Sequence, residues 1–297
     1  MFSLVRAFMR GPFIAGIILS SCFALGLLLS PFTLFSNALV SLMVLRNGFS
    51  KALSVFSISV ALCAVMCFAI LGNLAPLLPA VLFWIAAIIV ALSLRITRDY
   101  SLSLLLSTML VFVYLVLFRV NVTDLDEFWS EKIMEFVSLF SESDRVKIND
   151  DQIRSLSSQV HFFWIVLLSI IIKLGLIIGR YFQAYLYNPN GFGSEFRKIR
   201  QPIWLAAVFL GLVIFKVAIN TGEPFSITSD MLVLVTVIFA FQGVVFIHRK
   251  GKEIDLSKGF FYFFYIILVL FPQLVGFMLA VTGIVDTLGY RKKVISS

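Results

Sequence analysis

Charged residues are scarce in this sequence. Asp, Glu, Lys and Arg make up 13% of its 297 residues, which is roughly half the share found in a typical soluble protein. Apolar residues make up 60%, and a soluble fold of that composition would have too little polar surface to cover itself. Together with a mean hydropathy of +1.02, this excludes a soluble domain, a disordered chain and a nucleic-acid-binding domain. The composition predicts a polytopic membrane protein whose first partner is the lipid bilayer.

Cysteine and histidine are also rare, with three and two residues respectively. Cys22, Cys63 and Cys67 lie inside apolar runs with no histidine or carboxylate nearby. We therefore expect them to pack as small hydrophobic side chains rather than to bind a metal. No predicted span contains an HExxH motif, a GxSxG motif or a pair of acidic residues, which are patterns that carry hydrolytic chemistry. The sequence favours a non-enzymatic protein without a metal or a cofactor.

Long apolar runs fill most of the chain. A membrane-spanning helix needs about 20 apolar residues. Proline, which cannot continue the helical hydrogen-bond pattern, separates the first two runs at Pro31 and lies at the centre of the last run at Pro272. That last run either spans or re-enters the membrane. The sequence thus predicts an all-α polytopic transmembrane helix bundle of eight or nine segments, forming one integral membrane domain over 1–297. The candidate segments are 12–29, 32–45, 52–71, 77–94, 101–118, 160–179, 202–219, 231–247 and 259–283.

The distribution of Lys and Arg predicts the orientation. With the N-terminus in the cytoplasm, the inner segments hold 14 of these residues, whereas the short outer turns near 31, 73 and 225 hold none. Cytoplasmic loops of membrane proteins carry an excess of Lys and Arg, so this orientation is the predicted one. Nine spans would place Arg291, Lys292 and Lys293 outside, so the side on which the C-terminus lies stays open.

The one long outer loop, 119–158, has five basic and nine acidic residues. Its apolar residues recur at helical spacing, which predicts an amphipathic helix parallel to the outer surface. This helix either caps the bundle at the interface or acts as a lid over an outward-facing cavity. The apolar residues are Leu125, Phe128, Trp129, Ile133, Phe136, Val137 and Phe140.

Ionisable residues inside membrane spans are rare and are functional candidates by default. Lys173 lies within the run 160–179. It is predicted either to contact an anionic ligand or to pair structurally with a buried carboxylate or a helix-end carbonyl. Lys216 lies near the end of its run, where a long side chain can reach the headgroups. His161 begins a run at the interface, and Gln242 is expected to hydrogen-bond to a neighbouring helix.

The segment 180–201 combines turn residues, aromatic residues and charges at the predicted cytoplasmic boundary. The residues after Tyr187 predict a turn, and Gly191 and Gly193 are expected to adopt backbone conformations that other residues avoid. The segment is either a basic connector at the membrane surface or a motif that recruits a cytoplasmic partner. The candidate interaction residues are Arg180, Gln183, Asn188, Pro189, Gly191, Gly193, Glu195, Arg197 and Arg200.

These residues also carry a family resemblance that covers essentially the whole chain. The sequence resembles the YybS-like integral membrane proteins of bacteria, a family built on a domain of unknown function. That family is similar in fold to the substrate-binding S components of energy-coupling factor transporters. The resemblance implies a bacterial inner-membrane protein with an outward-facing ligand site and an inner face that docks a partner. The matching stretches are Phe8-Met9-Arg10-Gly11, Leu45-Arg46-Asn47-Gly48, Tyr187-Asn188-Pro189, Gly191-Phe192-Gly193, Glu195-Phe196-Arg197 and Gly283 to Asp286, with Arg180, Gln183, Arg200 and Arg291.

Two functions follow as expectations. The first is a small-molecule-binding or transport-associated membrane protein, with the helix of the outer loop as its lid and Lys173 as a ligand contact. The alternative is a non-transporting structural or interaction protein that recruits a cytoplasmic partner through residues 180–200. Small molecules that co-purify with the protein would distinguish the two.

Overall fold

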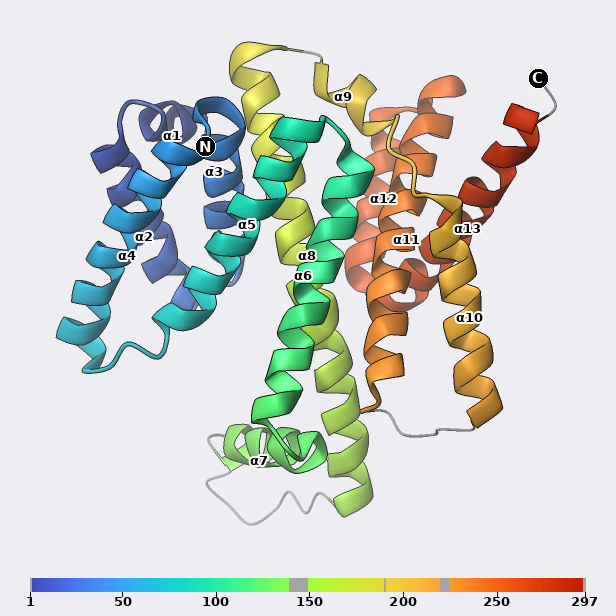
Figure 1. The fold of residues 1–297 in the computed structure, drawn as a ribbon, viewed down its shortest axis with the longest axis horizontal. Helices are drawn as coiled ribbons and strands as arrows, with labels where there is room; N and C mark the ends of the chain where they lie inside the picture. Colours follow the sequence, from blue (N-terminus) through green and yellow to red (C-terminus); the bar gives the residue numbers. More distant parts are fainter. Residues whose placement is uncertain (1, 139–148, 190, 220–224, 296–297) are drawn as a thin grey trace. The chain divides into compact units, whose positions relative to one another are not determined.

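The structure, a computed structural model, describes residues 2–138, 149–189, 191–219 and 225–295. Within these ranges the regular secondary structure consists of thirteen helices (Figure 1). The all-helical class predicted from the sequence is confirmed for this part of the chain. The helices are α1 (Phe2–Phe8), α2 (Pro12–Leu28), α3 (Pro31–Asn47), α4 (Phe49–Leu71), α5 (Leu77–Thr97), α6 (Tyr100–Asn121), α7 (Leu125–Ser138), α8 (Asp150–Tyr187), α9 (Gly191–Phe196), α10 (Ile203–Ile219), α11 (Ile227–Glu253), α12 (Lys258–Leu270) and α13 (Pro272–Ile295).

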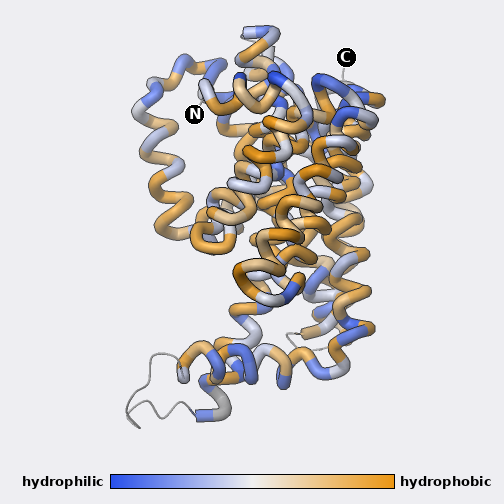
Figure 2. The backbone as a smooth tube through the Cα atoms, turned by 90° about the vertical axis from the view of Figure 1, so that its left-hand side faces the viewer, coloured by the Kyte–Doolittle hydropathy of each residue, from blue (hydrophilic) through white to orange (hydrophobic). Residues whose placement is uncertain are grey.

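Six of the described helices are long and apolar enough to cross a membrane: α4, α5, α6, α8, α11 and α13. Three shorter helices, α2, α10 and α12, are also apolar. Hydrophobic residues run along most of these helices (Figure 2). Large apolar side chains such as Val65, Phe68 and Ile70 are at least 70% exposed on α4, as expected for a surface that faces lipid. The chain is thus a multi-pass membrane protein, and the count of eight or nine segments stays a prediction.

The last predicted segment, 259–283, is divided into two helices. α12 ends at Leu270 and α13 begins at Pro272. A proline at the first position of a helix lacks only an N–H that would have no partner there, and its fixed φ suits the helix. The same residue cannot extend the preceding helix. Pro272 therefore starts a new helix instead of lying within one long segment.

The connection between α6 and α8 is shorter than the predicted loop 119–158. α6 continues to Asn121, and α8 begins at Asp150. Asn149 and Gln152 fix the start of α8 reciprocally: the Gln152 N–H donates to Asn149 Oδ1 at 2.8 Å and the Asn149 N–H donates to Gln152 Oε1 at 3.2 Å. This is the reciprocal pattern of a capping box. Residues 139–148 of the predicted loop, which include Phe140, lie outside the described residues.

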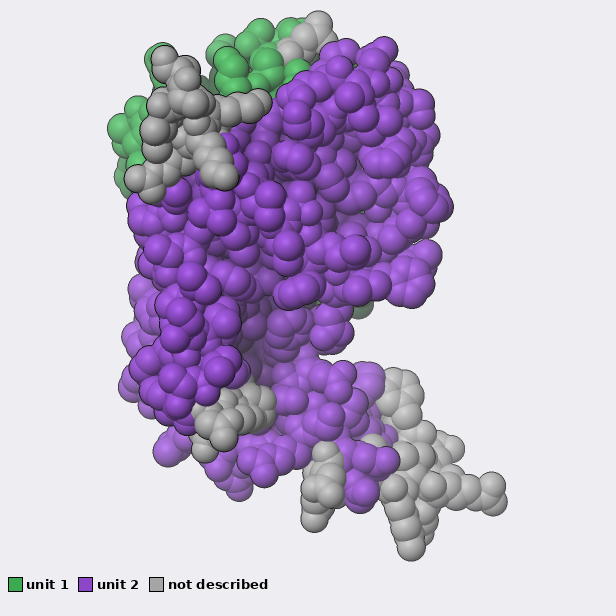
Figure 3. Space-filling model, turned by 90° about the vertical axis from the view of Figure 1, so that its right-hand side faces the viewer, with its two compact units in different colours: residues 1–107, 170–199 green, residues 108–169, 200–297 purple. Residues whose placement is uncertain are grey.

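The described chain forms two compact units, which Figure 3 colours separately. Unit 1 consists of residues 1–107 and 170–199, and unit 2 of residues 108–169 and 200–297. Each unit is thus assembled from two stretches of chain. Two of the boundaries fall within α6 and α8, and the third falls between α9 and α10. The single domain over 1–297 stays a prediction.

Small residues bring the helices of unit 1 into close contact. A Cβ on Gly16 of α2 would lie 2.4 Å from Ile58 Cγ2 of α4, and a Cβ on Gly179 of α8 would lie 2.7 Å from Ala38 O of α3. Such positions let backbones approach where apolar side chains would hold them apart. Trp84 of α5 fills the neighbouring core, and its indole N–H donates to Ser36 Oγ at 3.2 Å.

In unit 2, α11 and α13 pack against each other. Their closest approach lies at Gly243 and Gly283. A Cβ on Gly243 would lie 2.1 Å from Leu279 O, and a Cβ on Gly283 would lie 2.1 Å from Phe239 O. Both positions therefore require glycine, because the facing atom is backbone and cannot move aside.

Candidate functional site

The start of α11 places one carboxylate in the interior of unit 2. The N-cap Ser226 accepts a hydrogen bond from the Ser229 N–H at 3.2 Å, which fixes the first turn. Asp230 follows in that turn, where the helix dipole favours a negative charge. Its side chain is 1% exposed. A carboxylate removed from water to this extent requires compensating partners.

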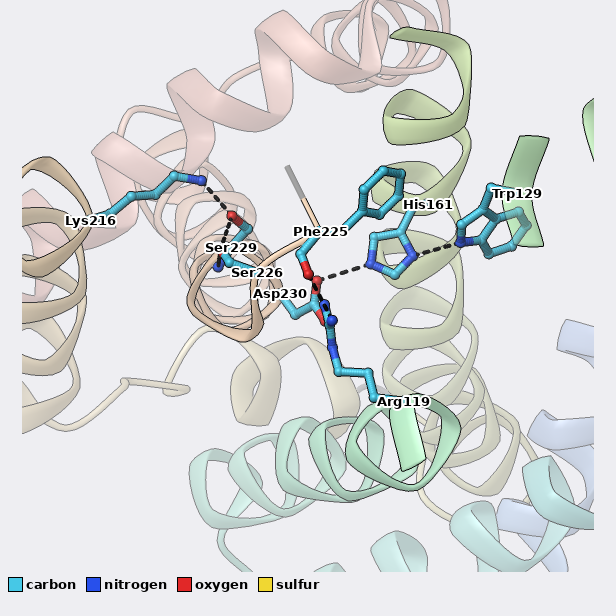
Figure 4. A network of polar contacts seen from close by, with 8 residues as sticks. All are labelled: Arg119, Trp129, His161, Lys216, Phe225, Ser226, Ser229 and Asp230. Carbon is cyan, nitrogen blue, oxygen red and sulfur yellow. Dashed lines mark hydrogen bonds and ion pairs between the residues drawn. The ribbon is translucent and has the colours of Figure 1, made fainter. Parts of the chain in front are cut away.

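Arg119, at the end of α6, supplies the opposite charge. Its Nε and Nη2 donate to Asp230 Oδ2 at 2.9 and 2.5 Å, and its Nη1 donates to the carbonyl of Phe225 at 2.7 Å. One guanidinium thus holds both the carboxylate and the backbone just before α11. Figure 4 shows Asp230 between Arg119 and His161.

His161 of α8 completes the shell of Asp230, and its partners determine its tautomer. The indole N–H of Trp129 on α7 lies 3.0 Å from His161 Nδ1, and His161 Nε2 lies 3.0 Å from Asp230 Oδ1. An indole N–H can only donate, so Nδ1 accepts and the ring proton is on Nε2, from which it is donated to Asp230. His161 is therefore a neutral, oriented imidazole with both nitrogens engaged, which suits a binding wall better than a general base.

The helix α7 is held by a cap at its first turn and by the hydrogen bond from Trp129 to His161. Asp124 Oδ1 accepts from the N–H groups of Asp126 and Glu127 at 2.9 and 3.0 Å, which caps the helix. On its exposed side, Lys132 Nζ donates to Glu135 Oε2 at 2.7 Å. This hydrogen bond lowers the pKa of Glu135 and raises the pKa of Lys132.

Lys216 of α10 lies on the other side of α11. Its ammonium donates to Ser229 Oγ, which lies 2.8 Å from Ser226 Oγ. Figure 4 shows the Lys216 side chain extended from α10 towards Ser229. The sequence predicted that this side chain would reach the headgroups, whereas the structure directs it to a hydroxyl on a neighbouring helix.

Four of these polar residues, His161, Lys216, Ser229 and Asp230, line one cavity of about 330 Å³ whose described lining lies within unit 2. The wall therefore combines one cation, the Asp230 carboxylate, hydroxyls and amides with an aromatic and aliphatic surface. Such a mixture, mostly apolar with a few fixed polar groups, is typical of small-molecule sites. The lining residues are Ser158, Gln159, His161, Phe162, Phe163, Ile165, Lys216, Ser229, Asp230, Leu232, Val233 and Gln273.

A second carboxylate in unit 2, Asp286 of α13, has a structural environment. It accepts from Arg249 and from Gln242 Nε2 of α11, the latter at 2.5 Å, and Arg200 Nη1 lies 3.4 Å away. Gln242 Oε1 also accepts from the Gln201 N–H at 3.3 Å. The predicted interhelical role of Gln242 is confirmed, and the cluster joins α11 and α13 close to Gly243.

Within unit 1, part of the motif over 180–200 forms contacts inside the protein. Glu195 accepts from Arg180 Nη2 at 2.6 Å and from the Tyr100 hydroxyl at 2.9 Å. Gln183 Nε2 donates to the Leu45 carbonyl at 3.2 Å. These groups stabilise the ends of α6, α8 and α3 around the short helix α9. Recruitment of a cytoplasmic partner through this motif stays a prediction.

The prediction that Gly191 and Gly193 adopt backbone conformations that other residues avoid is wrong. Within the described residues, the glycines with positive φ are Gly48 and Gly72, whereas Gly191 and Gly193 lie in α9 with ordinary helical backbone. The turn is closed instead by the Gly191 N–H, which donates to the Asn188 carbonyl at 3.2 Å. A Cβ at Gly191 would lie 2.6 Å from Nδ2 of the exposed Asn188 side chain, which can rotate aside.

Lys173 lies in the part of α8 that belongs to unit 1, and its side chain is completely buried. The cavity of unit 2 is lined by other residues. Both expectations for Lys173, a ligand contact and a structural pair, stay predictions.

Sequence reasoning missed Asp230 and Arg119. Arg119 was assigned to the acidic outer loop, and Asp230 lies one residue before the predicted segment 231–247. The available signal was a pair of single, opposite charges, each at the end of an apolar run. Because single charges are common at the ends of membrane-spanning helices, only the fold reveals that Arg119 and Asp230 form a pair.

Among the described residues, no group of three or more His, Cys, Asp and Glu residues is arranged to hold a metal ion. Comparisons of this chain with protein-family models, with curated proteins and with solved structures found no match. The cavity and its polar wall therefore provide the basis for a functional proposal.

Proposed function

We propose that this chain is a bacterial inner-membrane protein that binds a small molecule in the cavity of unit 2 and serves a transport-associated role. The observation that carries the proposal is the cavity of about 330 Å³, in which fixed polar groups face an apolar surface. The sequence resemblance to the YybS-like family, which is similar in fold to S components, supports the same proposal.

The polar wall supports binding because it is organised before a ligand arrives. Asp230 is held by Arg119 and His161, and His161 is oriented in turn by Trp129. A ligand that meets such a wall does not have to order these side chains, which lowers the entropic cost of binding. Ionisable residues within membrane helices also commonly mark substrate pathways.

Small molecules that co-purify with the protein test the proposal. Val233 lines the cavity, so Val233→Trp should fill it. Val269 of α12 is 77% exposed, which makes Val269→Trp the matched control in the same unit. We expect mass spectrometry to detect a bound molecule with the wild type and the control but not with Val233→Trp. Identical profiles for all three proteins would contradict cavity binding.

The proposal also includes a cytoplasmic N-terminus, supported by the distribution of Lys and Arg. Ser194 and Ser155 are exposed and lie on opposite sides in this orientation. In intact cells, an impermeant thiol reagent should label Ser155→Cys but not Ser194→Cys. The reverse result would invert the orientation.

A further inference from the structure

The formal charges of the described residues around the cavity do not balance. Among the described residues that line it, Lys216 and Asp230 carry formal charges, and His161 is neutral in the tautomer that its partners select. Asp230 is already neutralised by Arg119, two of whose N–H groups donate to Asp230 Oδ2. Counted over the described residues, one positive charge, on Lys216, is therefore left without a balancing carboxylate at the cavity.

The contact of Lys216 with Ser229 does not remove that charge. An ammonium has three N–H donors, and one of them is used by the Ser229 hydroxyl, which is uncharged. The Lys216 side chain is only partly exposed, so its hydration is incomplete. An anion would supply charge-assisted hydrogen bonds, which are stronger than those of a neutral acceptor.

The remaining residues of the cavity wall favour a ligand whose body is apolar and carries no further charge. Phe162, Ile165, Leu232 and Val233 are apolar, and an apolar surface does not compensate further charges. Resting on the proposed function, we infer that the cavity binds a small monoanion, a carboxylate or a phosphodiester. Its charged group would lie at Lys216 and Ser229 and its apolar body against these side chains.

The probes are benzoate, its neutral isostere benzamide and the cation benzylamine. They share one ring and differ in charge, so the wild-type protein alone can test the charge preference. Saturable increases in the Tm of the full-length protein in a non-ionic detergent report binding. We expect benzoate to raise the Tm, and benzamide and benzylamine to raise it much less.

Benzoate binding by substituted proteins then tests whether the preference for an anion arises at the cavity. Lys216→Met should weaken benzoate binding roughly 10- to 100-fold, the range for loss of a hydrogen bond to a charged group. Lys216→Arg should retain most of it. Lys252→Met is the control, because that side chain is 68% exposed elsewhere in unit 2. If Lys216→Met fails to fold, Ser229→Ala, which leaves the cation in place, should weaken binding more modestly.

The anionic group can belong to a free metabolite or to a lipid headgroup, and the same variants distinguish the two sources. In nanodiscs of phosphatidylcholine, benzoate should stabilise the protein. If phosphatidylglycerol abolishes this effect and remains bound to the wild type but not to Lys216→Met in native mass spectrometry, the anion is a lipid phosphate. If phosphatidylglycerol changes nothing, the source is a free anion.

Failure of benzoate to stabilise the wild type would overturn the inference, and so would equal stabilisation by benzamide or benzylamine. An unchanged response in Lys216→Met would overturn it as well. The proposed function is decided separately, because the co-purification test with Val233→Trp makes no assumption about the charge of the ligand.

Discussion

Asp230 of unit 2 and Glu195 of unit 1 have similar partners in different surroundings. Each carboxylate accepts from an arginine and from a second side chain with a ring: His161 for Asp230, and Tyr100 for Glu195. The Asp230 side chain is 1% exposed, whereas that of Glu195 is 35% exposed. Since water replaces a lost partner only where it can enter, similar contacts should differ widely in their effect on stability.

The largest effect is expected for Arg119→Met. It leaves the Asp230 carboxylate buried without its charge partner, and breaking a buried pair costs about 3–5 kcal/mol. The measurement is the free energy of unfolding in mixed micelles. Arg154→Met is the control, since Arg154 pairs with Asp126 but is 68% exposed, and it should change stability by less than about 1 kcal/mol.

The double variant sharpens this test. Asp230→Asn removes the charge that Arg119→Met leaves unpaired, so adding it to Arg119→Met should recover part of the loss. Equal losses for Arg119→Met and Arg154→Met would show that Asp230 is solvated, and the contrast between the two units would fail.

A smaller loss, about 1–3 kcal/mol, is expected for Arg249→Met. Asp286, its partner, has an 8% exposed side chain but keeps Arg200 and Gln242 after the substitution. Lys250→Met is the neighbouring control, because Lys250 forms an exposed pair with Glu253. A loss as large as that of Arg119→Met would mean that the remaining partners do not compensate.

The helices of this protein are far more predictable from its sequence than these polar networks are. Apolar runs locate spans because each run carries its own signal, and Pro272 marked the break within the last run. The motif over 180–200 was also visible, since Arg180 and Glu195 are only 15 residues apart. Arg119 and Asp230 are 111 residues apart. Neither is unusual alone, so no local pattern predicts that they pair.

Lys216 illustrates the same limit. A lysine near the end of an apolar helix can reach either headgroups or a neighbouring helix, and both choices satisfy its ammonium. The position of Ser229, set by the Ser226 cap of α11, decides between them in the structure. That information lies in the packing of α10 on α11 and not in the sequence around Lys216.

Trp129→Phe probes the outermost part of the Asp230 network and should cost about 1 kcal/mol. It keeps an aromatic ring on α7 but removes the donor to His161 Nδ1, which leaves a buried acceptor without its partner. Trp164→Phe is the matched control, because it replaces an indole by the same smaller phenyl ring within the same aromatic cluster. If both variants lose equal stability, packing rather than the hydrogen bond connects α7 to α8.

The smallest effect is expected for Glu195→Gln. The amide oxygen still accepts from the Tyr100 hydroxyl or from Arg180, and water reaches the side chain, which is 35% exposed. The loss of the ionic component should therefore stay below about 1 kcal/mol, and added salt should reduce the difference between variant and wild type. Unfolding measured at low and high ionic strength checks both statements. A loss comparable to that of Arg119→Met, insensitive to salt, would place Glu195 in surroundings as dry as those of Asp230 and remove the distinction between the two networks.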